Sequence, residues 1–148
     1  MTLAEQVGSL RRTLYRLLTR RLSGKTRRPL TQLLAVKFVA VRGVRTQAEL
    51  AERLLVDAPA VSRLVDRLEE EGLMKRCTGE DRRCVKLQAT DAGRAELETL
   101  EEVTQSLDEE AGRYLTDAEM VELKRLLEKL QVGLTQLVAP PSEGESQD

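Results

Sequence analysis

The chain has 148 residues, of which 41% are hydrophobic, 33% are charged and 2% are aromatic. This composition suits one domain, or a small module with an oligomerisation element, and excludes wholesale disorder. Two cysteines exclude a disulfide-rich secreted scaffold, and no apolar run approaches the roughly 20 residues of a membrane span. Because Arg11 and Arg12 interrupt the first apolar stretch, we expect no signal peptide, no membrane contact and a soluble, cytoplasmic protein.

The net charge of −1 conceals an uneven distribution of charge along the chain. Residues 1–42 carry +9, residues 43–90 carry zero and residues 91–148 carry −10. One interpretation is a basic side that faces phosphates and an acidic side that faces solvent. The other is a basic helix that pairs with an acidic helix inside a dimer, and both interpretations stay open.

The first 43 residues predict two helices of different character. Apolar residues at spacings of three and four predict an amphipathic helix over residues 2–22, which Ser23-Gly24 ends. A second helix over residues 30–41 is apolar on most of its circumference, and Gly43 closes it. A helix of this kind belongs in a core.

Two capped helices follow in close succession. Thr46 and Glu49 form a capping box, which predicts a short helix over residues 47–54 with Glu49 bonding back to its cap. After a three-residue connection, Asp57 caps a further helix over residues 58–71.

The periodicity then changes to that of strands. Residues 73–77 and 83–89 flank a polar turn, which predicts a β-hairpin. Beyond it the pattern predicts two long helices, over residues 91–113 and 117–137, and the second begins at another capping box at Thr116.

The order of short helix, tight connection, second helix and hairpin is that of a winged helix-turn-helix. The outward face of the helix over residues 58–71 carries small residues and arginines, which suit a major groove about 12 Å wide. These residues are Ala58, Ala60, Ser62, Arg63, Asp66 and Arg67. The free N–H groups at the start of the helix over residues 47–54, together with Thr46 and Gln47, suit the binding of a phosphate. A helical hairpin with solvated arginines is the alternative.

The predicted hairpin tip carries the second indication of nucleic-acid binding. Arg82 and Arg83 stand at an exposed turn, where arginine is favoured in a minor groove. Asp81 is placed to hold one guanidinium by a charge-assisted hydrogen bond and so to orient the wing. A charged turn alone is commonly just solvated, but its position directly after the second helix favours the DNA-binding interpretation.

These motifs together resemble the MarR family of bacterial regulators. The matching stretches are Gln47–Ala51, Val61–Glu69, Glu71–Leu73, Asp81–Arg83 and Leu87 through Thr90–Gly93, and the flanking helices follow the family order. The resemblance implies a mainly α fold with a small β-hairpin wing, and a homodimer whose first and last helices intertwine. It also implies recognition of a pseudo-palindromic double-stranded DNA site, with repression that a signal relieves.

The resemblance also assigns roles within this sequence. Recognition-helix contacts carry over onto Ala60, Ser62, Arg63 and Arg67, and wing contacts onto Arg82 and Arg83. The implied division is an N-terminal dimerisation helix, a winged helix-turn-helix domain, C-terminal dimerisation helices and a disordered tail. Their expected ranges are 1–28, 29–90, 91–138 and 139–148.

A small-molecule effector is a further implication of the family, which often binds small aromatic or anionic molecules near the dimer helices. This sequence offers few residues for such a site. Tyr15, Phe38 and Tyr114 are the aromatic candidates, and Arg16 and Arg20 are candidate partners of an anion. No particular ligand follows from them.

The two cysteines suggest a separate redox hypothesis. If Glu80-Asp81 is a two-residue turn, Cys77 and Cys84 face each other with their β carbons about 4.5–5.5 Å apart. A disulfide could then form with little rearrangement of the hairpin. In that register Lys75 and Lys86 lie on the same face of the hairpin as the two cysteines, and their positive charge favours the thiolate form of the cysteines. The alternative is that both cysteines only fill space. With no histidine beside them they supply half of a zinc site, so we expect no metal.

Catalysis finds no support in the sequence. The chain has no histidine, no phosphate-binding glycine loop and no nucleophile motif, and its carboxylates fall in solvated runs such as Glu69–Glu71. We therefore expect neither an enzyme nor a cofactor. The competing function is a winged helix that binds protein, which would not need Arg63, Arg67, Arg82 and Arg83 together. Steep salt dependence of binding would favour DNA.

Overall fold

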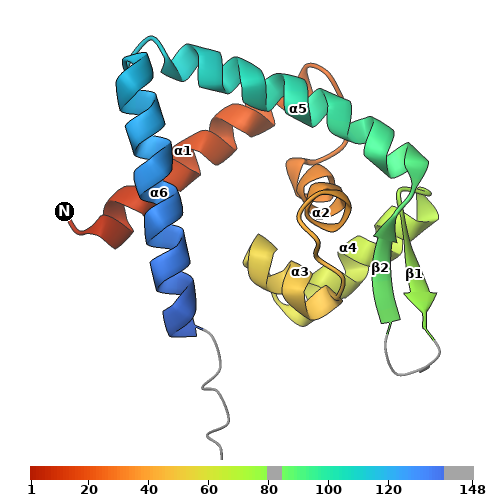
Figure 1. Ribbon diagram of the computed structural model, residues 1–148. Coiled ribbons are helices and arrows are strands. Elements are labelled where there is room, and N and C mark those ends of the chain that lie inside the picture. Colours follow the sequence, from red (N-terminus) through yellow and green to blue (C-terminus); the bar gives the residue numbers. More distant parts are fainter. Residues whose placement is uncertain (80–84, 139–148) are drawn as a thin grey trace, which may run out of the picture. The chain divides into compact units, whose positions relative to one another are not determined.

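The computed structural model describes residues 1–79 and 85–138, which form six helices and one antiparallel hairpin (Figure 1). The predicted fold, mainly α with a small β-hairpin, is confirmed. Each helix begins and ends within two residues of its predicted bounds. In chain order the elements are α1 (Leu3–Ser23), α2 (Leu30–Ala40), α3 (Gln47–Leu54), α4 (Ala58–Glu70), β1 (Met74–Thr78), β2 (Val85–Ala89), α5 (Asp91–Ala111) and α6 (Asp117–Val138).

The chain divides into two compact units, of which the first extends to Leu107 and the second begins at Asp108. The division into dimerisation and DNA-binding segments stays a prediction, and its last segment, 139–148, lies outside the described residues. No helix in the described part of the chain is both long and apolar enough to cross a membrane.

The main core of the first unit lies where α2, α3 and α4 pack beside the hairpin (Figure 1). The apolar face of α4 packs into this core, with Val61, Val65 and Leu68 at 0% exposure and Leu64 partly buried. Burying a side chain of this size stabilises the fold by about 1.5–3 kcal/mol. The backbone N–H of Leu87 donates to the Arg45 carbonyl at 2.7 Å, which holds β2 beside the segment that leads into α3. The helix-turn-helix is therefore rigidly seated.

A second cluster joins the end of α1 to α2 and α5 within the same unit. Its buried members are Leu22, Leu30, Leu33, Leu100 and Val103. Beside it, Arg28 in the α1–α2 connection forms ion pairs with Glu71 at the C-terminus of α4 and with Glu96 in α5.

The residues that join the hairpin to α5 are held by hydrogen bonds and close packing. The Thr90 hydroxyl donates to the Gly72 carbonyl at 2.6 Å, and the Thr90 N–H donates to the Leu73 carbonyl at 3.1 Å. Gly93, in the first turn of α5, lies so close to the Leu73 carbonyl that a Cβ atom there would overlap it. The start of α5 is thus fixed against the end of the helix-turn-helix.

In the second unit, α6 buries none of its residues. Its start agrees with the predicted capping box, because the Thr116 N–H donates to Glu119 at 3.0 Å and the Glu119 N–H donates to the Thr116 hydroxyl at 3.1 Å. Hydrogen bonds that the Glu119 carboxylate accepts from the backbone and the side chain of Thr116 lower the pKa of Glu119. Helical spacing puts six leucines on one face of α6, namely Leu123, Leu126, Leu127, Leu130, Leu134 and Leu137, which we call the α6 leucine stripe.

Candidate nucleic-acid interface

The N-terminus of α3 is capped by Thr46, as predicted. The Glu49 N–H donates to the Thr46 hydroxyl at 3.2 Å. The predicted return bond differs, since the Glu49 carboxylate accepts from the Thr46 hydroxyl at 3.2 Å instead of from its backbone N–H. A threonine hydroxyl can donate and accept at once, so one group carries both contacts.

The connection between α3 and α4 turns through a left-handed residue. Leu55 has φ 56° and ψ 45°, a conformation that ordinary L-residues seldom adopt. Two backbone bonds close the turn, from Leu55 to Glu52 at 3.3 Å and from Val56 to Ala51 at 3.1 Å. Asp57 then accepts from the Ala60 N–H at 2.8 Å and caps α4. The tight turn fixes the angle between the two helices of the motif.

The predicted reading residues on α4 divide into two groups by exposure. Ala58, Arg63 and Arg67 are exposed, whereas Ala60 and Ser62 are half-buried. Arg63 lies opposite the buried face of the helix. Arg67 lies farther to one side and lines a shallow cavity with residues of the α1–α2 connection, including Arg27 and Arg28. Arg63 is therefore the better placed of the two arginines to reach a base edge.

The hairpin register corrects the prediction for the cysteines. Cys77 pairs with Lys86, and Thr78 pairs with Val85, so Cys77 does not face Cys84. The predicted register assumed a two-residue turn, whereas the observed pairing leaves six residues between the last paired positions. Lys75 and Lys86 do share a face with Cys77, because paired residues and alternate residues of a strand point to the same side.

The predicted wing tip lies outside the described residues. Asp81, Arg82, Arg83 and Cys84 all belong to the segment 80–84. Their roles stay predictions, and the geometry of the interface rests on α3, α4 and the two strands.

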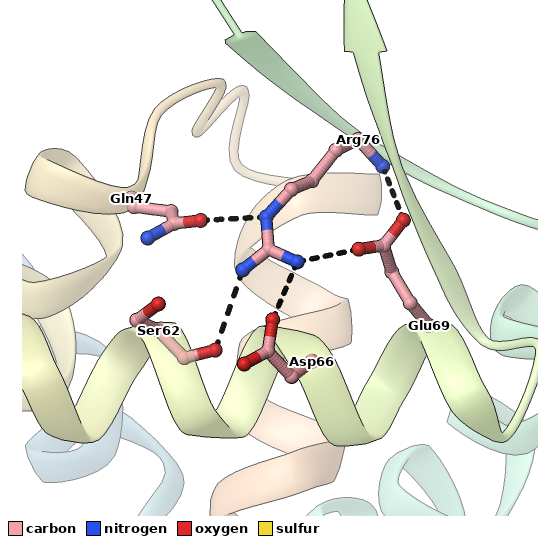
Figure 2. A network of polar contacts seen from close by, with 5 residues as sticks. All are labelled: Gln47, Ser62, Asp66, Glu69 and Arg76. Atoms are coloured by element: carbon pink, nitrogen blue, oxygen red, sulfur yellow. Dashed lines mark hydrogen bonds and ion pairs between the residues drawn. The ribbon is translucent and has the colours of Figure 1, made fainter.

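Arg76 on β1 forms a polar cluster with α3 and α4 that the sequence does not predict. Its Nε donates to the Gln47 side-chain oxygen at 2.8 Å, and its Nη1 donates to Asp66 at 2.7 Å and to Glu69 (Figure 2). Its Nη2 donates to the Ser62 carbonyl at 3.3 Å. We call these five residues the Arg76 cluster.

The Arg76 cluster is held by charge as well as by geometry. Partial burial by itself would lower the pKa of Arg76, but hydrogen bonds and charges from Asp66 and Glu69 outweigh it and raise that pKa. The backbone N–H of Arg76 also donates to Glu69 at 3.1 Å. The cluster therefore connects strand and helix through both side chain and main chain.

One sequence signal could have indicated this cluster. Asp66 and Glu69 are three residues apart on one helix, and a basic residue in the following strand is a natural partner for them. The sequence alone predicts Asp66 on the DNA-facing side and gives Gln47 only a phosphate-binding role. The structure shows that both side chains also bind Arg76.

Of the candidate effector residues, Tyr15, Arg16 and Arg20 together line one open hollow on α1, whereas Phe38 does not line it. Tyr15 packs on the second core cluster, with Arg11 over its ring at 5.6 Å. Phe38 packs on the main core, with Arg53 at 5.9 Å. Arg16 and Arg20 line a small groove along α1. Tyr114 belongs to the second unit and is 83% exposed.

Comparisons with known proteins give a consistent family. The model of the MarR family matches residues 29–85. The transcriptional repressor IacR of Pseudomonas putida is 28% identical over 87 residues, 58% of this chain, and the match spans about half (52%) of that protein's length. The apo structure of wild-type MarR from E. coli is 28% identical with a TM-score of 0.75 and covers 88% of this chain and 97% of its own.

A third relative shows the same fold. A MarR family protein of Mycobacterium tuberculosis, solved in complex with p-aminosalicylic acid, is 24% identical with a TM-score of 0.76 and covers 88% of this chain and 99% of its own. The family match falls on α2, α3, α4 and β1, which build the interface, and the structural matches extend over most of the chain. The chain thus has the winged-helix fold of MarR family structures and matches the MarR family model over residues 29–85.

Proposed function

We propose that the protein is a dimeric transcription regulator that binds a specific double-stranded DNA site and represses until a signal releases it. The observation that carries the proposal is the outward face of α4. That helix has one face locked into the core and Arg63 exposed on the other, between a capped α3 and a hairpin wing. A helix seated in this way can enter a major groove without losing its packing.

Each element has its own role in the proposed complex. Arg63 and Arg67 contact bases or nearby phosphates in the major groove, where arginine bonds to guanine are the most frequent specific contacts. Ala58, Ala60 and Ser62 are small enough to let the helix approach the bases. Thr46 and Gln47 hold a phosphate at the start of α3. Arg82 and Arg83 contact the minor groove, with Asp81 orienting them.

The exposed apolar residues of α1 and α6 support the proposed homodimer. Leu3, Val7 and Leu10 on α1 are about half exposed, and so are Leu126, Leu127 and Leu134 on α6. Exposed apolar surface of this extent marks an interaction site. A two-fold dimer predicts a pseudo-palindromic site with half-sites about one helical turn, or ~10 bp, apart.

The proposed sign of regulation and the proposed signal rest on relatives. IacR is named a transcriptional repressor, and the mycobacterial relative is named as a complex with p-aminosalicylic acid. We therefore propose repression that a small organic anion relieves. The corrected register removes the geometric basis for a disulfide between facing cysteines, so a redox signal is not part of this proposal.

The test is selection of bound duplexes from random DNA, followed by binding of the enriched duplex at increasing salt. We expect a pseudo-palindromic consensus, and an affinity that falls steeply with salt because phosphate contacts release counterions. Failure to enrich any sequence, together with salt-independent capture of a protein partner, would support the competing winged-helix protein-interaction module.

A further inference from the structure

Arg76 is the point at which three elements of the candidate interface meet. It belongs to β1, it contacts the first residue of α3, and it contacts α4 at three positions (Figure 2). Its side chain is 24% exposed, which is low for an arginine on a hairpin. A guanidinium has five donors in a fixed planar arrangement, so it can restrain several neighbours in different directions at once.

The contact with Gln47 determines which end of that amide points outward. The Gln47 oxygen accepts from Arg76 Nε at 2.8 Å, and its NH2 group lies on the far side from the guanidinium (Figure 2). A phosphate oxygen can only accept hydrogen bonds, so a phosphate at the start of α3 requires the donor end of the amide. Arg76 thus orients Gln47 in the sense that phosphate binding needs.

The contacts with α4 concern two carboxylates on the helix proposed to enter the groove. The Asp66 side chain is 58% exposed and the Glu69 side chain is 35% exposed. Unpaired carboxylates beside the DNA backbone would repel it. Arg76 Nη1 binds both of them and also fixes the distance between β1 and α4.

We propose that Arg76 is a positioning residue for DNA reading, which sets the outward donor of Gln47 and holds helix and wing in one arrangement. It acts through Gln47, Asp66 and Glu69 and does not itself contact a base. This inference rests on the proposed function, because it assigns a role within the same DNA-binding surface.

The first experiment compares wild type and Arg76→Lys on the duplex that wild type selects and on unrelated duplex DNA. Lysine keeps the charge but carries its three donors on a single nitrogen, so it cannot reach all the partners that the three nitrogens of the guanidinium reach. Because charge-assisted bonds to Gln47, Asp66 and Glu69 are lost or rearranged, we expect affinity for the selected duplex to fall about tenfold or more. Affinity for unrelated DNA should change less than about threefold, because it depends chiefly on charge.

Phosphate-ethylation interference on the same complexes gives a readout that a loss of stability would not produce. Gln47→Glu keeps the oxygen that Arg76 binds but replaces the outward NH2 with an acceptor. We expect Gln47→Glu and Arg76→Lys to lose the same phosphate contact. Lys75→Gln is the matched control, since it removes a charge from the adjacent, exposed residue of β1, and it should retain that contact.

A triple variant separates positioning from charge neutralisation. Arg76→Gln, Asp66→Asn and Glu69→Gln together remove every charge of the cluster and also its ion pairs. If positioning matters, this variant still binds the selected duplex at least about tenfold more weakly than wild type. Wild-type affinity in the triple variant, or an unchanged affinity and interference pattern in Arg76→Lys, would overturn the inference.

Two further measurements keep the outcomes distinct. The urea midpoint of each variant shows whether it folds, and if Arg76→Lys does not, Asp66→Asn takes its place because that side chain is more than half exposed. Asp66→Asn should weaken selected-duplex binding more than unrelated-duplex binding, and an equal effect on both would contradict the inference.

If wild type itself enriches no duplex, the proposed function fails. If wild type selects a site and Arg76→Lys reads it equally well, only the role of Arg76 fails.

Discussion

Helices α4 and α6 carry similar patterns of apolar residues but differ in what those residues contact. In α4, Val61, Val65 and Leu68 are completely buried against the core of their own unit. In α6 no residue is buried, and Leu126 and Leu127 are 47% and 45% exposed. An apolar stripe therefore indicates that a helix has a partner, but it does not indicate whether the partner lies in the same chain.

The largest expected effect tests the buried half of this comparison. Leu68→Ala should lower the free energy of unfolding by about 2–5 kcal/mol, because it leaves a cavity in a fully packed core. Urea denaturation measures it. Val121→Ala on α6, where the side chain is 68% exposed and lies off the leucine stripe, is the control and should stay within about 0.5 kcal/mol of wild type.

The exposed half is tested by a charge placed in the α6 leucine stripe. Leu127→Glu should weaken self-association by about 2 kcal/mol or more, since it would bury an unpaired carboxylate in the proposed dimer. Analytical ultracentrifugation over a range of concentrations measures the dissociation constant. Val132→Glu adds the same charge on the opposite face and should leave association unchanged, so equal effects of the two variants would place the interface elsewhere.

Two glycines sharpen the comparison with the same chemical change. Gly93→Ala should destabilise the first unit by about 1–3 kcal/mol, because the new methyl group overlaps the Leu73 carbonyl. Gly133→Ala meets open space in α6 and should add about 0.5–1 kcal/mol of helix stability. Thermal unfolding followed by circular dichroism reports both changes. A destabilising Gly133→Ala would indicate that a second chain packs closely there.

Sequence reading by α4 gives a prediction of similar size that leaves stability intact. Arg63→Ala should reduce discrimination at one base position by about 1–3 kcal/mol. Competition binding between the selected duplex and its single-base variants measures this loss. A uniform loss against every base substitution would show that Arg63 contacts phosphate and not a base.

The smallest effect concerns the start of α6. Thr116→Ala removes the cap and should cost about 1 kcal/mol of helix stability. The pKa of Glu119 is lowered by its hydrogen bonds to Thr116, so its contribution is present above the pKa of the unfolded state and is lost as the pH falls through the folded-state pKa. The difference between wild type and Thr116→Ala should therefore shrink in acid. A constant difference down to the lowest pH would contradict the role of Glu119.

Local signals were enough to predict the helices and the hairpin. Caps at Thr46, Asp57 and Thr116 are short-range chemistry, and each begins the predicted helix. Helical periodicity in the same way predicts that Arg63 is exposed and that the opposite face of α4 is buried.

The strand register and the Arg76 cluster could not be predicted as easily. Register depends on the length of the turn, and the pairing of Cys77 with Lys86 excludes the two-residue turn on which the cysteine hypothesis depends. The Arg76 cluster joins Arg76 to partners that lie 29, 14, 10 and 7 positions away along the chain. Only the packing of β1 against α3 and α4 brings them together, and the spacing of Asp66 and Glu69 alone does not identify the basic residue that meets them.

The junction at Thr90 and Gly93 has a consequence for operator binding. Because α5 starts directly against Leu73, the recognition helix and the first turn of α5 form one rigid piece within the first unit. A signal that tilts the start of α5 would therefore tilt the recognition helix with it. Operator binding would then change even when every contacted base is correct.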